Sequence, residues 1–166
     1  MIPTATTVPP TWPLHGASLR TAMGRFFERA FSLRGRASRS EYWWWMLLNI
    51  VTMTMLQLVI PTLLNGRLTD GTIVVGPFGS LVFSSVSVAT WNGAEAANPT
   101  AVAILSIIAG GWLLLTAIPG VTVAVRRLHD SNLSGWWALL GVIPFGALIV
   151  LALAARQSRA EAFRFD

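Results

Sequence analysis

The sequence predicts an all-α membrane protein: a small bundle of three or, on an alternative count, four transmembrane helices, preceded by an amphipathic interfacial helix. Apolar residues make up 54% of the 166 residues and charged residues only 11%, whereas an average soluble domain is roughly 25% charged. Long segments carry no charged side chain at all. All twelve basic residues are arginines, and they gather beside those segments. This chain has too little charge to cover a water-facing surface.

The N-terminal 40 residues divide into a tail and a helix. Residues 1–17 carry four prolines and several threonines, a composition typical of a poorly ordered tail. Residues 18–40 combine an arginine-rich motif with a helical pattern, in which apolar residues recur every three or four positions at Leu19, Met23, Phe26, Phe27, Ala30 and Leu33. Such a helix lies in the membrane interface or packs on the protein's own membrane domain, and the two arrangements are compatible.

The transmembrane domain is predicted over residues 41–155. Three segments in it lack charge and are long enough to cross about 30 Å of hydrocarbon: residues 42–64, 101–125 and 135–155. Residues 65–100 are ambiguous, because β-branched residues alternate there among glycines, prolines and serines. We expect a hairpin-like extracytoplasmic loop, with a marginal span over residues 72–90 or a re-entrant segment as alternatives. Residues 156–166 are expected to form a short polar tail.

The arginines predict the orientation in the membrane. Six precede the first span, one lies between the first and second spans, two lie in the turn after the second span and three lie in the tail. Three spans with a cytoplasmic N-terminus place eight arginines on the cytoplasmic side, and four spans place nine there. Because cytoplasmic segments carry the excess of basic residues, both counts predict a multi-pass protein with its N-terminus in the cytoplasm.

Two charged motifs lie at the ends of the spans. RGRASRSEYWWW leads into the first span, and RRLHDSNLSGWW separates the second span from the third. In the second motif, residues 130–132 favour leaving a helix, and Ser134 is a suitable N-cap for the next one. We assign a structural or lipid-headgroup role to the charged residues of both motifs, Arg34, Arg36, Arg39, Glu41, Arg126, Arg127, His129 and Asp130. The aromatic residues expected at the membrane interface are Trp43, Trp44, Trp45, Trp136 and Trp137.

The carboxylates of these motifs are expected to form ion pairs, because a charged group in a region of low dielectric is costly unless it has a partner. Glu41 is expected to pair with Arg126 or Arg127. Asp130 is expected to pair with Arg36 or Arg39. These pairs would pin the first span against the turn. The alternative is that the arginines bind the phosphate headgroups of anionic lipids through bidentate hydrogen bonds.

In these two motifs the chain resembles the domain-of-unknown-function 805 family, the YhaH-like bacterial inner-membrane proteins. The matching stretches are GRASRSEYWWW (residues 35–45) and RRLHDSNLSGWWALLGVIP (residues 126–144), and the likeness extends over about residues 26–155. The resemblance implies a small helical protein of the bacterial cytoplasmic membrane with no established activity. The chain departs from the family in a longer loop between the first two spans and in its tail.

The sequence predicts no catalytic, cofactor-binding or metal-binding site. The lack of cysteine excludes disulfides and thiolate ligands, and two histidines do not by themselves form a zinc site. Nucleic acid is disfavoured as a partner, because the arginines flank apolar segments instead of lining an independent domain. A membrane enzyme with His129 as a base oriented by Asp130 is a further hypothesis, but no nucleophile or phosphate-loop motif accompanies these two residues.

The function expected from the sequence is that of a non-enzymatic scaffold, or of a module that interacts with anionic membrane lipids through arginine-rich motifs at the cytoplasmic face. The alternative is a small transporter or channel subunit for an uncharged substrate, because the three spans hold no ionisable group that would serve ion transport. Gly110 and Gly111 permit close helix approach, so a homo-oligomer or an unidentified membrane-protein partner stays open.

Overall fold

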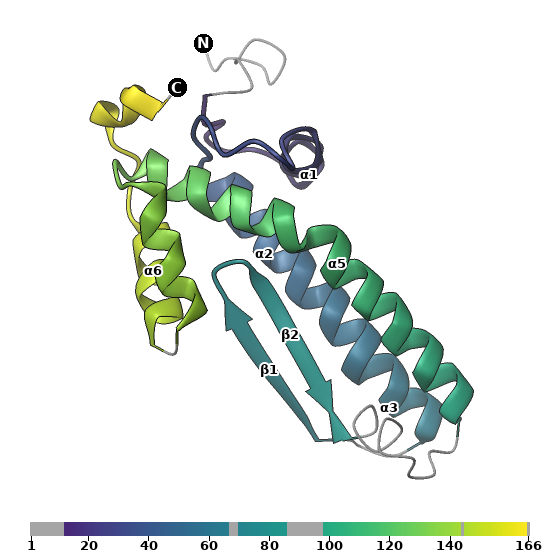
Figure 1. Cartoon of the computed structure of the whole chain (residues 1–166). Coiled ribbons are helices and arrows are strands. Elements are labelled where there is room, and N and C mark those ends of the chain that lie inside the picture. Colours follow the sequence, from purple (N-terminus) through teal and green to yellow (C-terminus); the bar gives the residue numbers. More distant parts are fainter. Residues whose placement is uncertain (1–11, 67–69, 86–97, 144, 166) are drawn as a thin grey trace. The chain divides into compact units, whose positions relative to one another are not determined.

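The computed structural model describes residues 12–66, 70–85, 98–143 and 145–165. This part of the chain is mostly helical and contains one two-stranded sheet (Figure 1). It divides into two compact units. Unit 1 comprises Met1–Leu47, Gly76–Phe78 and Ala117–Asp166, and unit 2 comprises Leu48–Val75 and Gly79–Thr116.

The first apolar segment forms a continuous helix from Arg39 to Asn65, as predicted for residues 42–64. It consists of α2 (Arg39–Thr54), a π-helical turn η1 (Met55–Val59) and α3 (Ile60–Asn65). The wider turn precedes Pro61, whose ring in a regular α-helix would clash with the carbonyl four residues earlier. Gly66 ends the helix in the left-handed conformation, with a φ of 64°.

The second apolar segment forms α5 (Pro99–Asp130), which extends five residues beyond the predicted span at residues 101–125 and ends where residues 130–132 were expected to leave the helix. The first residue of α5 is a proline, which has no N–H group and so leaves no backbone donor unpaired at the start of the helix. The 32 residues of α5 reach about 48 Å. The two helices Arg39–Asn65 and Pro99–Asp130 are long and apolar enough to cross a membrane.

The charged turn after α5 has the predicted chemistry. Asn132 adopts the left-handed conformation with a φ of 60°. Its N–H donates to the His129 carbonyl at 2.8 Å, and the Leu133 N–H donates to the Leu128 carbonyl at 3.0 Å. These two bonds make a Schellman motif, which satisfies carbonyls that the helix leaves unpaired. The prediction of Ser134 as the next N-cap is confirmed, because its side chain accepts a hydrogen bond from the Trp136 N–H.

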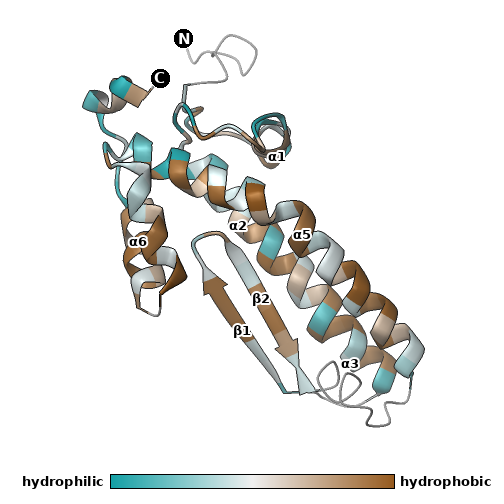
Figure 2. Cartoon of the chain, viewed as in Figure 1, coloured by the Kyte–Doolittle hydropathy of each residue, from teal (hydrophilic) through white to brown (hydrophobic). Residues whose placement is uncertain are grey.

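The ambiguous segment contains a β-hairpin, as predicted, and not a fourth helix over its described residues. Strands β1 (Gly71–Gly76) and β2 (Gly79–Ser84) pair with each other, and their central residues are apolar (Figure 2). Val82 packs with Met53 and Ala109, which lie well inside the two long helices. The hairpin therefore packs beside the helices of unit 2. Residues 86–97 lie outside the described part of the chain.

The prediction of one continuous span over residues 135–155 is wrong. Residues 135–142 form a 3-10 helix, η2 (Gly135–Val142), and the chain becomes helical again only in α6 (Gly146–Ala155). Ile143 is extended (φ −98°, ψ 147°), as expected of a residue that precedes a proline. Phe145 has a φ of 62°. The two pieces reach about 16 Å and 15 Å, so neither alone crosses about 30 Å of hydrocarbon.

The two short helices pack against each other and against the end of α5. Val125 and Leu128 of α5 form one buried cluster with Ala138 of η2 and Val150 of α6. A Cβ added at Gly146 would clash with the Leu140 carbonyl oxygen, so the close approach of η2 and α6 requires glycine there. The C-terminal apolar segment is therefore a folded-back helical pair (Figure 1).

The N-terminal segment is ordered earlier than predicted. Helix α1 (Leu19–Glu28) is capped by Ser18, whose side chain accepts a hydrogen bond from the Thr21 N–H. The tail was expected to be poorly ordered through residue 17. However, Leu14 is buried, and the Ala17 carbonyl accepts a hydrogen bond from the Trp44 indole at 2.9 Å. Residues 1–11 lie outside the described part of the chain.

The C-terminal tail folds back onto unit 1. A 3-10 helix η3 (Ala160–Phe165) ends the described chain. The Gly35 N–H donates to the Phe165 carbonyl at 2.9 Å, and the Arg159 N–H donates to the Asp130 carbonyl at 2.9 Å. Ala162 is fully buried. The tail is thus an integral part of unit 1, which the sequence did not predict.

Candidate functional site

The two charged motifs meet in unit 1. The Ala37 N–H donates to the Arg126 carbonyl at 3.1 Å, and Nδ1 of His129 lies 3.3 Å from the Gly35 carbonyl oxygen. Gly35 reaches this position with a φ of 82°, a conformation that favours glycine. Backbone groups of the first motif therefore hold it against the last turns of α5.

Arg127 and Asp130 form a fully buried ion pair, with both side chains 0% exposed. Asp130 was expected to pair with an arginine of the first motif, but its Oδ2 accepts hydrogen bonds from Arg127 Nη1 and from the Ser158 hydroxyl. Arg127 Nε donates to the Ala154 carbonyl at 2.8 Å, and Nη2 donates to the Arg156 carbonyl. The guanidinium thus caps the C-terminal end of α6, where a positive charge also meets the negative end of the helix dipole.

Glu41 has a partner that the sequence did not predict. Arg126 and Arg127 were the expected partners, but Oε1 of Glu41 lies 3.0 Å from Nε of Arg25 on α1. Oε2 accepts a hydrogen bond from the Ser38 N–H at 2.7 Å, and the Glu41 N–H donates to the Ser38 hydroxyl at 3.2 Å. This reciprocal arrangement is a capping box at the start of α2. The Ser-x-x-Glu spacing was visible in the sequence and was overlooked.

Three buried arginines surround Glu41 within unit 1, and we call Arg25, Arg29, Arg126 and Glu41 the arginine cluster. These residues are 9%, 7%, 3% and 6% exposed, respectively. Arg29 Nη2 donates to the Arg34 carbonyl, and burial lowers the pKa of Arg29, with a further decrease from Arg25 and an opposing effect of Glu41. Arg126 Nε donates weakly to the Thr122 carbonyl at 3.4 Å.

His129 and Asp130 make separate contacts. The His129 ring stacks on Phe165 with a centroid distance of 4.2 Å and an interplanar angle of 1°, and its Nδ1 faces the Gly35 carbonyl. The Asp130 carboxylate faces Arg127 and Ser158. The arrangement of a histidine base oriented by the neighbouring aspartate is therefore not formed. Within the described residues, no group of three or more His, Cys, Asp or Glu side chains could hold a metal ion.

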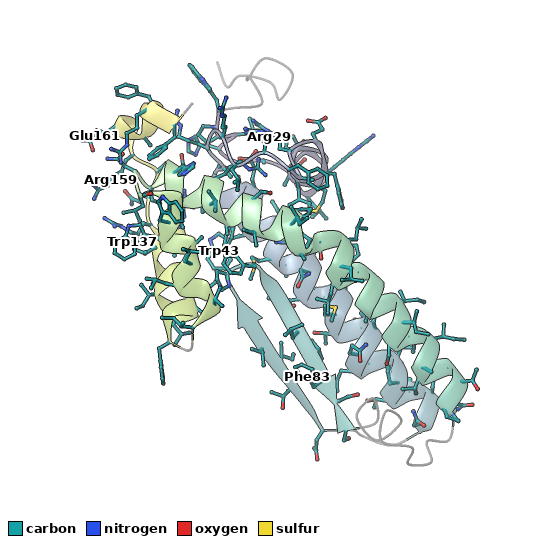
Figure 3. All side chains as sticks on the ribbon, viewed as in Figure 1. Arg29, Trp43, Phe83, Trp137, Arg159 and Glu161 are labelled. Carbon is teal, nitrogen blue, oxygen red and sulfur yellow. The ribbon has the colours of Figure 1, made fainter. Side chains whose placement is uncertain are left out.

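The remaining predicted residues lie at the surface of unit 1 to different extents. Arg34 and Arg39 are exposed and Arg36 is half-buried. Trp136, Trp137 and Trp43 are 78%, 45% and 40% exposed. Trp137 and Trp43 are labelled in Figure 3. Trp44 is half-buried, and its indole is bonded to the Ala17 carbonyl. Trp45, the third tryptophan of the first motif, was also expected at the membrane interface, but it is fully buried and stacks on Phe26 of α1 at 4.1 Å.

Comparison with known proteins gives the family. Residues 30–166 match the family described as "Protein of unknown function (DUF805)". The chain belongs to the DUF805 family. It is 31% identical to inner membrane protein YhaH of Escherichia coli (strain K12) over 133 residues, which cover 80% of this chain and 82% of YhaH. It is 28% identical to inner membrane protein YhaI of the same organism over 132 residues, covering 79% of this chain and 80% of YhaI. No solved structure matches this member of the DUF805 family.

The match to the DUF805 family includes the C-terminal residues that fold onto unit 1. It also includes both charged motifs and the Arg127–Asp130 pair. Arg25 and the whole of α1 precede the matched region. The ion pair between Arg25 and Glu41 therefore joins a helix outside the family match to the first motif within it.

Proposed function

We propose that this protein is a non-enzymatic, multi-pass protein of the bacterial cytoplasmic membrane that binds anionic lipid at the cytoplasmic face through unit 1. The separation of charge between the two units carries this proposal. Eleven of the twelve arginines and five of the seven acidic residues belong to unit 1, which gives it a formal net charge of +6. Unit 2 contains one arginine and two acidic residues, a net charge of −1. A positive unit joined to an apolar one suits the boundary between anionic headgroups and hydrocarbon.

The exposed side chains of unit 1 support the choice of anionic lipid. Its exposed arginines are Arg20, Arg34, Arg39, Arg156, Arg159 and Arg164. Among the described residues of unit 1, the exposed carboxylates are those of Glu28 and Glu161. Glu161 and the exposed Arg159 are labelled in Figure 3. Exposed aromatic side chains accompany the arginines, with Trp136 at 78% and Phe31 at 82% exposure. Arginine next to tryptophan is the composition expected at the headgroup level.

The folded-back C-terminal pair favours one topology. Two full spans, α2 with α3 and then α5, return the chain to the side on which it started. If η2 and α6 enter the membrane and return, the tail lies on that same side, in agreement with the bond between Gly35 and Phe165 in unit 1. Eleven arginines then lie on the cytoplasmic side and one on the other. This is a stronger bias than the eight or nine of the three-span and four-span alternatives.

A reporter fused to the C-terminus tests this topology. We expect a cytoplasm-specific reporter at the C-terminus to be active, as one at the N-terminus would be. Activity of a periplasm-specific reporter at the C-terminus would contradict the returning pair.

Lipid binding is tested with purified protein and native mass spectrometry. We expect phosphatidylglycerol to be retained in preference to phosphatidylcholine. Each basic residue near an anionic surface contributes about 1 kcal/mol, so Arg34→Gln with Arg39→Gln should weaken retention about 30-fold. The matched Arg34→Lys, Arg39→Lys variant keeps the charge and should bind almost as well as the wild type. Equal retention of both lipids, or no effect of the glutamine pair, would refute the proposal.

A further inference from the structure

The arginine cluster has more positive than negative charge. Arg126 lies within electrostatic range of Arg29, Arg25 and Glu41. All four side chains are at least nine-tenths buried. A buried guanidinium group is costly unless acceptors surround it. The positive charges around Arg126 favour an anion as a further acceptor for its guanidinium group.

The single carboxylate of the cluster is already engaged by several donors. Oε1 of Glu41 lies 3.0 Å from Arg25 Nε. Oε2 accepts hydrogen bonds from the Ser38 N–H at 2.7 Å and from the Leu14 N–H at 3.3 Å. Arg126 Nη2 is buried and has no hydrogen-bond partner among the described residues. A guanidinium nitrogen in this state is a donor without an acceptor, which costs about 1–3 kcal/mol or more for a charged group.

Arg126 borders a small cavity within unit 1. The other residues that line it include Arg25 and Glu41 of the cluster and the apolar Ala22, Phe26 and Ala37. The cavity has room for a group about the size of one water molecule, so it admits a single oxygen atom rather than a whole phosphate. Arg126 lies four residues before the end of α5, about 6 Å along the helix axis. The headgroup layer has a similar thickness, about 5–7 Å on each side of the bilayer.

We propose that this cavity binds one oxygen of a phosphate group, supplied by the headgroup of an anionic phospholipid, with Arg126 as its principal ligand. Arg25 and Arg29 supply the surrounding positive charge, and Ala22 and Ala37 leave the space for the oxygen. The lipid as the source of the phosphate rests on the proposed function. The cavity as a phosphate site rests on the geometry of the arginine cluster alone.

The test measures thermal unfolding of delipidated protein in a neutral detergent by tryptophan fluorescence. Inorganic phosphate is compared with chloride at equal ionic strength, and phosphatidylglycerol is compared with phosphatidylcholine. At a phosphatidylglycerol concentration about 100 times its Kd, Tm should rise by about 5–10 °C, and inorganic phosphate should act in the same direction. Chloride and phosphatidylcholine should have no such effect.

Two variants assign the effect to the cavity. Ala37→Val fills the space without changing any charge, and Arg126→Gln removes the ligand. Both should abolish the rise in Tm, whereas Ala155→Val, at an exposed position of α6, should retain it. Without phosphate, Arg126→Gln should melt no lower than the wild type, because it removes an uncompensated charge; a merely structural arginine would show a loss of stability.

The possible results separate this site from the proposed function. Responses to phosphatidylglycerol and to inorganic phosphate that Ala37→Val and Arg126→Gln both abolish support the site. A response to phosphatidylglycerol alone would overturn the phosphate oxygen as the group that the cavity binds. A response to inorganic phosphate alone would overturn the lipid source. An unchanged response in both variants would overturn the cavity, while the surface arginines of unit 1 could still bind lipid. Conversely, loss of binding in these variants but not in the Arg34, Arg39 pair would uphold the cavity and refute the proposed surface.

Discussion

Asp130→Ala should destabilise the protein severely, because it leaves the charge of Arg127 without its carboxylate. Both side chains are fully buried. Removing one partner of a buried ion pair costs about 3–5 kcal/mol. Arg127 would keep its bonds to the Ala154 and Arg156 carbonyls, so we expect the lower end of this range, about 3 kcal/mol. For a chain of this length, that loss corresponds to a decrease in Tm of about 6–12 °C.

The measurement is thermal unfolding in a neutral detergent, followed by tryptophan fluorescence. Glu161→Ala is the matched control, because that carboxylate is exposed and its removal should change stability by no more than about 0.5 kcal/mol. Arg127→Lys keeps the charge but not the geometry, and should lose about as much as Asp130→Ala. A Tm within about 2 °C of the wild type for Asp130→Ala, or full stability of Arg127→Lys, would refute the role assigned to the pair.

Two further perturbations test the packing within each unit. Gly146→Ala should lower Tm strongly, because its methyl group would clash with the Leu140 carbonyl. In the control Gly24→Ala the added methyl group meets nothing within 4 Å, so this change should add about 0.5–1 kcal/mol to the stability of α1. Similar effects of the two changes would contradict the close contact of η2 and α6. Asn49→Ala should cost about 1–3 kcal/mol, because the buried Ser80 N–H and hydroxyl donate to Asn49 Oδ1 at 2.6 and 2.7 Å. Faster hydrogen exchange of the Ser80 amide would verify this loss, and an unchanged rate would count against it.

The sequence predicted the features that depend on local physics. The two long helices follow from uncharged segments that match the length of a span, at residues 42–64 and 101–125. The end of α5 follows from Asn132, whose short polar side chain tolerates the left-handed conformation. The hairpin follows from alternating β-branched residues beside glycine and proline. These signals act within a few residues, so one sequence was sufficient to read them.

The fold of residues 135–155 was missed because hydropathy does not report the path of the backbone. The segment is as apolar as a transmembrane helix. Its composition is equally compatible with one long helix and with two short helices that pack together. Pro144 was the available signal, since it disfavours a helical Ile143. Gly146 gave a second signal, because a residue without a side chain allows two helices to approach closely.

The ion pairs could be predicted only in part. Their existence followed from the cost of a buried carboxylate, but the identity of the partners did not. Arg127 and Asp130 are three residues apart on one helix and could have been paired from their spacing. Arg25 and Ser158 reach Glu41 and Asp130 through tertiary contacts over 16 and 28 residues of chain. Such contacts depend on how α1 and the tail pack, for which a single sequence offers no local signal.

Adjacent arginines at the end of α5 have different surroundings, because successive residues of a helix do not share a face. The three nitrogens of Arg127 bind three acceptors, on Ala154, Asp130 and Arg156. A lysine ammonium offers its donors from one atom and cannot reach these acceptors together. Each side-chain nitrogen of Arg127 therefore has an acceptor within the protein. Arg126 keeps Nη2 unpartnered beside a cavity among buried positive charges. The same dipeptide therefore provides one residue that stabilises the fold and one with the chemistry to bind an anion.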